Sequence, residues 1–380
     1  MKIAISHIRH ADTGGTEQFL NQIAHQLAVE GHHVSILCRT HANASHPNIK
    51  FVAFNNWALG RGHRLWRFAK DVERHIGQHS YDVVLGLGRT WSQDIIRVGG
   101  GLYREQIGQG QGKSRWWPKD IIARLIEKRS FTPSNYQLVL ANSEQTRHSL
   151  ANEYQIPTDK MVTIHNAVDI SRFSDSIRSD AGLALRQQCG FSESNNVFLF
   201  LGSGYQRKGL DRLLPAFAEI AKTDSNARLI VVGFESSQAS YQRLAETLNI
   251  DQQVTFLGGR KDVEVCYNAA DCYVMPTRFD AFGYSAIEAL ACGLPVIITD
   301  SAGAAEVMPK ALTTIVSNNE DTIQAELVTA MQQHSGKAKQ VQFRQQAIAA
   351  AANNSIHVVM QKNIDQLLRI AAAKKQKAAQ

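Results

Sequence analysis

Cysteines and long apolar runs are scarce in this sequence of 380 residues. Its five cysteines are odd in number and form no CxxC pair, which argues against a disulfide framework and is typical of a reduced, cytoplasmic chain. No run approaches the roughly 18 apolar residues that a membrane-spanning helix needs. The first residues, MKIAISHIRHADTGG, turn polar too soon for a signal peptide, so we expect a strand there.

The sequence also lacks a GxGxxG fingerprint, a convincing metal-ligating constellation and a nucleic-acid recognition module. Its net charge of +7 and pI near 9.1 suit an anionic partner, such as a membrane surface, a phosphorylated substrate or a nucleic acid. The basic residues are scattered along the chain, however, and this argues against nucleic acid. We therefore expect no nucleic-acid partner and no bound metal.

Short apolar runs alternate with amphipathic segments along the whole chain. Such alternation favours parallel sheets covered by helices on both faces, and 380 residues exceed one ordinary core. The sequence therefore predicts an α/β protein with two doubly wound, Rossmann-like domains. The predicted strands are KIAISHI, HVSILCR, IKFVAF, YDVVLGLG, YQLVLANS and MVTIHNAV in the first half, and VFLFLGS, ARLIVVGF, VTFLGG, CYVMPT, PVIITD and TTIVS in the second.

A polar, serine-rich stretch at 169–196 separates the two sets of strands. We place the first domain at 1–170 and the second at 180–355, and we expect the C-terminal helix, about 356–376, to join the first domain. The last residues, AAAKKQKAAQ, predict a solvated basic tail. Ligands bind beyond the carboxyl ends of parallel strands, so two such domains facing a central cleft would place a site in that cleft.

A glycine-containing loop follows the first strand of each half of the sequence. Gly14-Gly15 lies just before a helix, where backbone amides can approach an anion. Arg207 and Lys208 are adjacent in the loop GSGYQRKG, where an arginine fork and a lysine charge can clamp a diphosphate. A tight turn and a solvated basic turn remain the alternatives.

Two carboxylates stand eight positions apart in the stretch TRFDAFGYSAIEALACGLPVI. Asp280 is predicted in a loop after a strand, Gly283 permits a sharp entry into a helix, and Glu288 lies in that helix. The backbone N–H groups of Ala281, Phe282 and Gly283 would be free to donate. The two acids can thus grip two sugars on either side of a diphosphate. The alternative is a solvated aspartate and a glutamate that favours the helix dipole.

These residues resemble the family 4 retaining glycosyltransferases, which have the GT-B fold. The stretch FDAFGYSAIEALACGLPVI resembles the motif of that family in which a carboxylate precedes a glutamate by seven intervening residues. Gly14-Gly15, GSGYQRKG, HNAVDISRF and FLGGRKDV are similar to further blocks in the same order. The chain is most similar to the lipopolysaccharide core glucosyltransferase I subgroup, which uses UDP-glucose.

The resemblance implies that a hexose passes from a nucleotide sugar to a saccharide acceptor without a metal or another cofactor. Glu288 would hold the ribose, Asp280 a hydroxyl of the transferred sugar, and Arg207 and Lys208 the diphosphate; these four are the expected catalytic residues. The donor-binding set adds Gly14, Gly15, Arg172, Arg260, Ala281, Phe282, Gly283 and Tyr284. In two places the sequence departs from the family pattern: Asp280 stands where a glutamate is usual, and Ala167 where a glycine is usual.

Residues 113–130, KSRWWPKDIIARLIEKRS, predict a basic amphipathic helix flanked by tryptophans. Such a helix suits an anionic membrane interface, although an ordinary helix packed on its own domain is the alternative. We expect peripheral binding to the cytoplasmic face of the inner membrane, where a lipid-linked saccharide such as the lipopolysaccharide inner core would be the acceptor. The expected membrane contacts are Trp116, Trp117, Lys119, Arg124 and Lys128, and the expected acceptor contacts are His10, Tyr103, Arg104 and Glu105.

Other functions share parts of this pattern. A GT-B-fold sugar-nucleotide epimerase would use the same nucleotide site without an acceptor, and a non-catalytic sensor would only bind the nucleotide sugar. A family 4 transferase could also take GDP-mannose, ADP-heptose or UDP-N-acetylglucosamine, because pocket shape rather than these motifs sets the donor.

Overall fold

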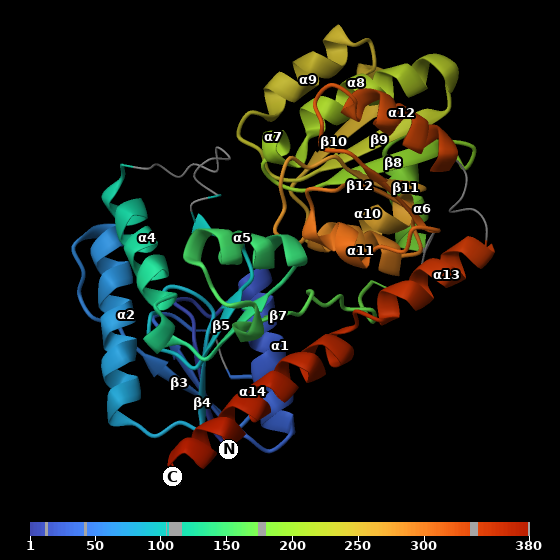
Figure 1. Ribbon diagram of the computed structural model, residues 1–380. Helices are drawn as coiled ribbons and strands as arrows, with labels where there is room; N and C mark the ends of the chain where they lie inside the picture. The colour runs from blue at the N-terminus through green and yellow to red at the C-terminus, as the bar shows by residue number, and fades with distance from the viewer. Residues whose placement is uncertain are drawn as a thin grey trace. The chain divides into compact units, whose positions relative to one another are not determined.

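The computed structural model describes residues 1–11, 14–41, 44–103, 105, 116–173, 180–334 and 341–378. The chain divides into two compact units (Figure 1). Unit 1 contains Met1–Asn166 and Ile356–Gln380, and unit 2 contains Ala167–Ser355. The sequence placed this boundary between 170 and 180.

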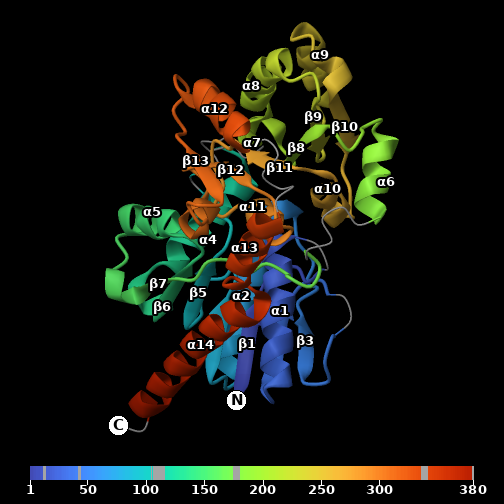
Figure 2. The ribbon, with the colours of Figure 1, turned by 90° about the vertical axis from the view of Figure 1, so that its right-hand side faces the viewer.

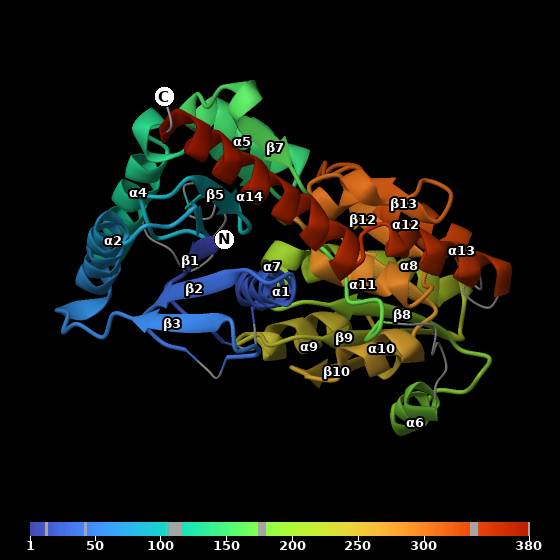
Figure 3. The same cartoon turned by 90° about the horizontal axis from the view of Figure 1, so that it is seen from below.

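Unit 1 is built on a parallel sheet whose described strands run in the order β3-β2-β1-β4-β5-β6-β7. The chain starts in the middle of the sheet, moves to the β3 edge, and then returns past β1 to the other edge; β3 lies at its edge beside β2 in Figure 3. Short apolar strands such as VVLG suit the buried centre of such a sheet. The strands are β1 (Lys2–Ser6), β2 (His33–Cys38), β3 (Ile49–Ala53), β4 (Val83–Gly86), β5 (Ile95–Val98), β6 (Leu138–Ala141) and β7 (Met161–Thr163).

Helices cover the sheet of unit 1. Helix α2 packs Phe68 and Val72 on Ala4, Leu37 and Val84 of the sheet. Helix α14 contacts both α1 and β4, so the C-terminal segment belongs to the same layer as the N-terminal helix (Figure 2). The helices are α1 (Gly15–Val29), α2 (Gly60–Gln78), α4 (Pro118–Ser130), α5 (Glu144–Tyr154) and α14 (Ile356–Ala378).

Residues 371–378 continue α14, and residues 375–378 are exposed, as expected of a solvated basic end of the chain. Lys374 Nζ lies 3.0 Å from Asp94 Oδ2, and Lys375 Nζ lies 3.2 Å from Asp82 Oδ1. Alanine and lysine are good helix formers, which suits the continuation of the helix to Ala378.

Unit 2 holds a second parallel sheet, whose described strands run in the order β10-β9-β8-β11-β12-β13. All six runs predicted from the second half of the sequence are strands here. The strands are β8 (Asn196–Leu201), β9 (Ala227–Val232), β10 (Val254–Gly258), β11 (Cys272–Met275), β12 (Val296–Thr299) and β13 (Thr313–Val316).

Both faces of this second sheet are apolar and buried. Helices α8 and α12 contact each other over one face, through a core that includes Phe198, Phe200 and Phe217 (Figure 2). The other core includes residues of α10, α11 and α13. The helices are α6 (Asp180–Gln188), α7 (Tyr205–Lys208), α8 (Leu210–Thr223), α9 (Gln238–Thr247), α10 (Val263–Ala269), α11 (Tyr284–Ala291), α12 (Ile323–His334) and α13 (Val341–Ala352).

Candidate functional site

The strand order of unit 2 reverses between β8 and β11, and crevices at such reversals are where open α/β sheets bind ligands. Arg207 and Lys208 follow β8 in the short helix α7, and Asp280 follows β11. Because β8 and β11 are neighbouring parallel strands, their carboxyl ends bring these three residues together. The cations and the acid are more than 70 residues apart in the sequence, and the pairing of β8 with β11 brings them together in the fold.

The three side chains form one charged cluster. Lys208 Nζ lies 2.5 Å from Asp280 Oδ2, and Arg207 Nη1 lies 3.3 Å from the same oxygen. The Lys208 side chain is only 9% exposed, whereas that of Arg207 is 26% exposed. Burial alone would raise the pKa of Asp280, but the charges of Lys208 and Arg207 outweigh burial and hold that pKa below its usual value. Asp280 is therefore ionised at neutral pH and both cations are kept in place.

Gly283 sets the entry into α11. Its φ is 94°, a conformation that favours glycine, and a Cβ there would lie 2.8 Å from the Met275 side chain. Asp280 stays close to this turn because its Oδ1 accepts a hydrogen bond from Phe282 N at 3.2 Å. The expectation that all three backbone N–H groups of 281–283 are free to donate is therefore wrong for Phe282, whose N–H already has this acceptor.

Glu288 lies in α11, half-buried, with its Oε2 accepting a hydrogen bond of 2.8 Å from Tyr267 Oη. Burial raises the pKa of Glu288 above its usual value, although Tyr267, Arg172 and Lys208 act in the opposite direction. One carboxylate oxygen of Glu288 is thus held by a buried tyrosine. Tyr267 was not among the residues singled out from the sequence, since a tyrosine within a short helix gives no signal of its partner.

Two further predicted donor residues lie in unit 2, each with its own ion pair. Arg172 Nη2 is 2.7 Å from Glu264 Oε2, and Arg260 Nη2 is 2.6 Å from Asp262 Oδ2. The charge of Arg172 nevertheless lowers the pKa of Glu288, which places the two residues in one electrostatic neighbourhood. The side chain of Tyr284, the first residue of α11, is half-buried with its ring edge on Phe282.

An exposed aromatic ring at the same edge of the sheet was missed in the sequence. Phe234 follows β9 and is 74% exposed, although large apolar side chains are usually covered. Its Cβ lies near Gly259, in the loop that follows β10 and carries Arg260. In the sequence, Phe234 ends the apolar run ARLIVVGF and cannot be distinguished from a core residue.

In unit 1, Gly14 caps α1 with φ at 110°, and Gly15 is the first residue of the helix. A Cβ on Gly14 would lie 2.3 Å from Glu17 Oε2, so the acid of the first turn sits directly against this glycine. Interactions with His7 and with Arg9, whose Nη2 lies 2.6 Å from Glu17 Oε1, lower the pKa of Glu17 to about 2.

Three of the four predicted acceptor residues are described by the structure. His10 packs edge-on against Phe51, and Glu105 accepts a hydrogen bond from Leu102 N. Tyr103 is almost fully buried and donates its hydroxyl hydrogen to Asp120. Arg104 lies outside the described residues. Tyr103 does line a cavity of unit 1, whereas His10 is not among the residues that line it.

Among the described residues, no group of three or more histidine, cysteine, aspartate or glutamate side chains could hold a metal ion. None of the described helices has the length and apolarity needed to cross a membrane.

Comparisons with known proteins agree with this arrangement. Residues 13–172 match the family model described as Glycosyltransferase Family 4, and residues 183–353 match that described as Glycosyl transferases group 1. The chain belongs to the family 4 glycosyltransferases. The resemblance inferred from the sequence is confirmed, and the catalysed reaction is a hexosyl transfer.

Relatives of this glycosyltransferase match different shares of the chain. The lipopolysaccharide glucosyltransferase WaaG of Escherichia coli (strain K12) is 24% identical over 318 residues, which are 82% of this chain and 83% of that protein. The D-inositol 3-phosphate glycosyltransferase of Corynebacterium aurimucosum is 30% identical over 188 residues, but these span only 47% of this chain and 44% of that enzyme.

Solved structures confirm the predicted fold of two Rossmann-like domains. The crystal structure of WaaG, a glycosyltransferase involved in lipopolysaccharide biosynthesis, matches with a TM-score of 0.75 and 22% identity, over 96% of this chain and 99% of that one. The structure of Anabaena Alr3699/HepE in complex with UDP-glucose matches with a TM-score of 0.72 and 20% identity, over 97% and 100% of the two chains. At these identities the likeness concerns the fold of this glycosyltransferase.

Proposed function

We propose that this glycosyltransferase moves glucose from UDP-glucose to a lipid-linked saccharide, the lipopolysaccharide inner core, with retention of the anomeric configuration. The observation that carries the proposal is the cluster of Arg207, Lys208 and Asp280 at the point where the strand order of the unit 2 sheet reverses. Glu288 lies in α11, the helix that follows the loop of Asp280. The similarity to WaaG over 82% of the chain supports the choice of sugar and acceptor.

Each member of the cluster has a role that its chemistry suits. Arg207 and Lys208 neutralise the diphosphate of the donor, and Asp280 accepts a hydrogen bond from a hydroxyl of the transferred glucose. Glu288, with one oxygen held by Tyr267, accepts hydrogen bonds from the ribose hydroxyls. Phe234, exposed beside the loop of Arg260, offers its ring to the uracil, because a flat aromatic face stacks on a base.

The reaction breaks the bond between the anomeric carbon and the diphosphate oxygen and forms a bond from the same face to an acceptor hydroxyl oxygen. The acceptor proton passes to the leaving phosphate oxygen, so the chain need not supply a general base. The barrier falls because Arg207 and Lys208 stabilise the charge that develops on the departing diphosphate. Since these cations neutralise it, we propose that no metal ion is required.

The donor proposal is tested by thermal shift with UDP-glucose, UDP-galactose, UDP-N-acetylglucosamine, GDP-mannose and ADP-heptose. A ligand that binds only the folded state raises its stability in proportion to ln(1 + [L]/Kd). We expect UDP-glucose to give the largest shift, Glu288→Ala to abolish it, and Glu246→Ala, an exposed change on α9, to leave it intact. A larger shift with another sugar nucleotide would replace the donor, and no shift with any of them would overturn the proposed site.

We also propose that unit 1 binds the anionic surface of the inner membrane from the cytoplasmic side. The predicted contacts Trp116 and Trp117 are 79% and 60% exposed at the start of α4. Two residues missed in the sequence, Trp57 and Leu59, are 70% and 69% exposed just before α2. Leu59 and Trp117 line the same apolar groove, so the exposed apolar side chains of the two segments adjoin. We call Trp57, Leu59, Trp116 and Trp117 the aromatic surface.

The two helices that begin at the aromatic surface carry cations. Lys128 is exposed on α4, with Lys119 and Arg124 half-buried on the same helix, and Arg61, Arg64 and Lys70 are exposed on α2. Tryptophan at the interface and lysine or arginine beside it are the pairing that anionic bilayers favour. Gly62 allows the two helices to meet, since a Cβ there would lie 2.9 Å from the Ile122 side chain.

A further inference from the structure

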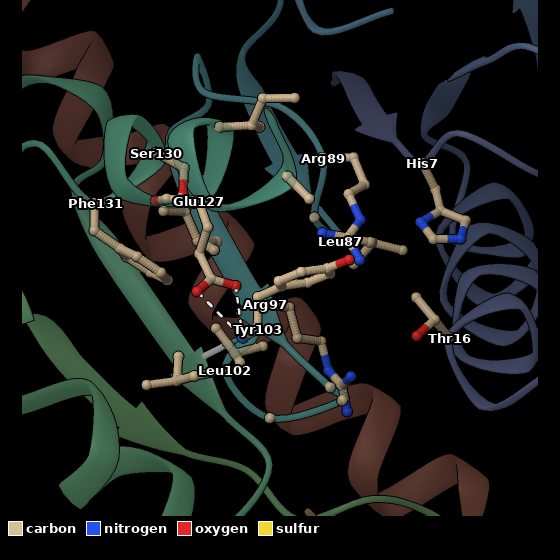
Figure 4. A pocket seen from close by; sticks show the side chains of 18 residues that line it. His7, Thr16, Leu87, Arg89, Arg97, Leu102, Tyr103, Glu127, Ser130 and Phe131 are labelled. Atoms are coloured by element: carbon tan, nitrogen blue, oxygen red, sulfur yellow. Dashed lines mark hydrogen bonds between the residues drawn. The ribbon is translucent and has the colours of Figure 1, made fainter. Parts of the chain in front are cut away.

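Unit 1 contains a cavity of about 180 Å³ at the carboxyl ends of its central strands (Figure 4). It is lined by residues that follow β1, β4 and β5, and by one side of α4. His7 and Thr16 lie on one side of it in Figure 4, opposite Arg89, Tyr103 and Arg97. The volume is below the roughly 300 Å³ of an ordinary small-molecule site, so the cavity suits one substituent rather than a whole saccharide.

The charge of the cavity lining is positive. Arg89 and Arg97 contribute two guanidinium groups. Glu127 is the one carboxylate among the lining residues described, and its oxygens already accept hydrogen bonds from Tyr103 N and from Tyr154 Oη at 2.6 Å. An anion entering the cavity would therefore meet more positive than negative charge.

Arg89 is held in a costly conformation. Its φ is 68°, a left-handed conformation that is unfavourable for residues other than glycine, and it directly follows Gly88 at φ 98°. Within the described part of the chain, its guanidinium makes no hydrogen bond or ion pair and stands 4.8 Å from the centre of the Tyr103 ring. A strained backbone that presents a half-buried, uncommitted guanidinium to a cavity is better explained by a ligand than by stability.

Arg97 is fixed before any ligand arrives. It is 4% exposed on the central strand β5, with its guanidinium 3.6 Å from the centre of the Phe19 ring and its Nη2 2.5 Å from Asn166 Oδ1. A Cβ on Gly99 would lie 2.9 Å from Arg97 Nη1, so the strand end leaves this nitrogen room. Burying a charge in a sheet costs free energy unless the charge is paired or hydrogen-bonded. The guanidinium of Arg97 borders the same cavity as that of Arg89, where an anion could pair with it.

We propose that this cavity is an anion subsite that receives a phosphate or carboxylate substituent of the saccharide acceptor, bound by Arg89 and Arg97. Both groups match the planar fork of arginine. The inference rests on the proposed function, in which Arg207 and Lys208 of unit 2 serve the donor diphosphate. A second pair of cations in unit 1 is then left for the other substrate. The acceptor contact expected at Tyr103 becomes a wall of this subsite rather than a hydrogen-bond donor to the sugar.

The test measures thermal shifts with inorganic phosphate at constant ionic strength, both without UDP and with saturating UDP to occupy the donor site. We expect phosphate to stabilise the full-length protein, Arg89→Gln to weaken its apparent affinity by about tenfold, and Arg89→Lys to restore part of it. The matched control is Arg369→Gln, which removes an equal charge from the exposed face of α14.

Three outcomes would overturn the subsite: an equal phosphate response in Arg89→Gln and wild type, an equal loss in Arg369→Gln, or a phosphate effect that UDP abolishes. The last would assign the anion to the donor. UDP binding alone tells whether the proposed function stands, because it is measured on the same samples before phosphate is added. If UDP binds and phosphate does not, only the subsite is wrong.

Discussion

The strained backbone of Arg89 allows a structural role of this residue to be distinguished from a functional one by mutation. We expect Arg89→Gly to leave the free energy of unfolding unchanged or to raise it by up to about 1 kcal/mol, because glycine removes the strain at φ 68°. The same change removes the guanidinium, so the KM for the acceptor should rise while the KM for the donor stays constant. Urea unfolding and steady-state kinetics measure the two effects.

Arg89→Ala is the matched control, since it keeps the strain and also removes the guanidinium. Both variants should lose acceptor affinity, but only Arg89→Gly should gain stability relative to Arg89→Ala. A loss of more than about 1 kcal/mol in Arg89→Gly would contradict the argument and make Arg89 a structural residue.

The Lys208–Asp280 pair predicts a second effect at the scale of single residues. Lys208→Met leaves a half-buried carboxylate with only Arg207 beside it, and we expect it to lower the free energy of unfolding by about 3 kcal/mol at neutral pH. The pKa of Asp280 should rise at the same time, because Lys208 is the strongest of the charges that lower it. Chemical denaturation and NMR titration of the carboxyl measure these changes.

A double-mutant cycle gives the control for this pair. Adding Asp280→Asn to Lys208→Met removes the stranded charge, so the double variant should be more stable than the sum of the single losses predicts. Additive losses would mean that the 2.5 Å contact does not couple the two side chains in solution.

Some of the site residues could be predicted from their residue types, and others could not. Asp280, Glu288, Arg207 and Lys208 could be chosen from the sequence because charged residues beside glycine loops stand out from apolar runs. Phe234, Tyr267 and Arg89 could not, since nothing local tells an exposed or strained residue from an ordinary one. Strand β5 was also missed, because the charge of Arg97 interrupts the apolar pattern of its short run IIRV.

At the scale of elements, the start of α1 is expected to be sensitive to acid. The pKa of Glu17 is lowered from its ordinary value of 4.5 to about 2, so its contribution to stability is present above about pH 4.5 and is lost as pH falls towards 2. We expect the stability difference between wild type and Glu17→Gln to be up to about 3 kcal/mol at pH 7 and to vanish near pH 2.

Urea unfolding across this pH range measures the difference, with Glu30→Gln as control because Glu30 lies just after the same helix and is exposed. The comparison is between variants, since other carboxylates titrate in the same range. A difference that stays constant with pH would show that Glu17 acts by packing against Gly14 rather than by its charge.

Helices α2 and α4 together predict membrane binding that neither segment would give alone. We expect Trp116→Ala/Trp117→Ala to weaken sedimentation with vesicles that contain anionic lipid, and Trp57→Ala/Leu59→Ala to weaken it by a similar factor. Each exposed apolar side chain that enters the interface contributes part of about 1.5–3 kcal/mol, so loss of two should cost about tenfold or more.

Neutral vesicles and the variant Val341→Ala, which changes an exposed apolar residue of unit 2, serve as the two controls. Wild-type affinity that is equal for neutral and anionic vesicles would remove the role of the surrounding cations. Unchanged sedimentation of both tryptophan variants would contradict the aromatic surface as a membrane contact.

At the scale of the whole molecule, the two sheets could be predicted because every strand except β5 is an apolar run and most of them alternate with amphipathic segments. The order of the strands could not be predicted, because neighbours such as β8 and β11 are separated by more than 70 residues. Nothing in the sequence of either strand indicates that the two pair. The site depends on that order. Its residues could therefore be proposed from the sequence, while their contact at one sheet edge required the structure.

The return of the chain to unit 1 gives the last prediction. Helix α14 buries Val359, Met360, Ile364, Leu367 and Ile370, and it contacts α1 and β4. Truncation after Ser355 would expose this surface, and at about 1.5–3 kcal/mol for each large side chain the loss is comparable with the whole stability of an ordinary domain. In calorimetry we therefore expect the truncated protein to lose the cooperative transition of unit 1 and to keep that of unit 2, still raised by UDP. Ile364→Asp should act like the truncation and Leu368→Asp, on the exposed side of the same helix, should not. Loss of both transitions on truncation would mean instead that the two units unfold as one.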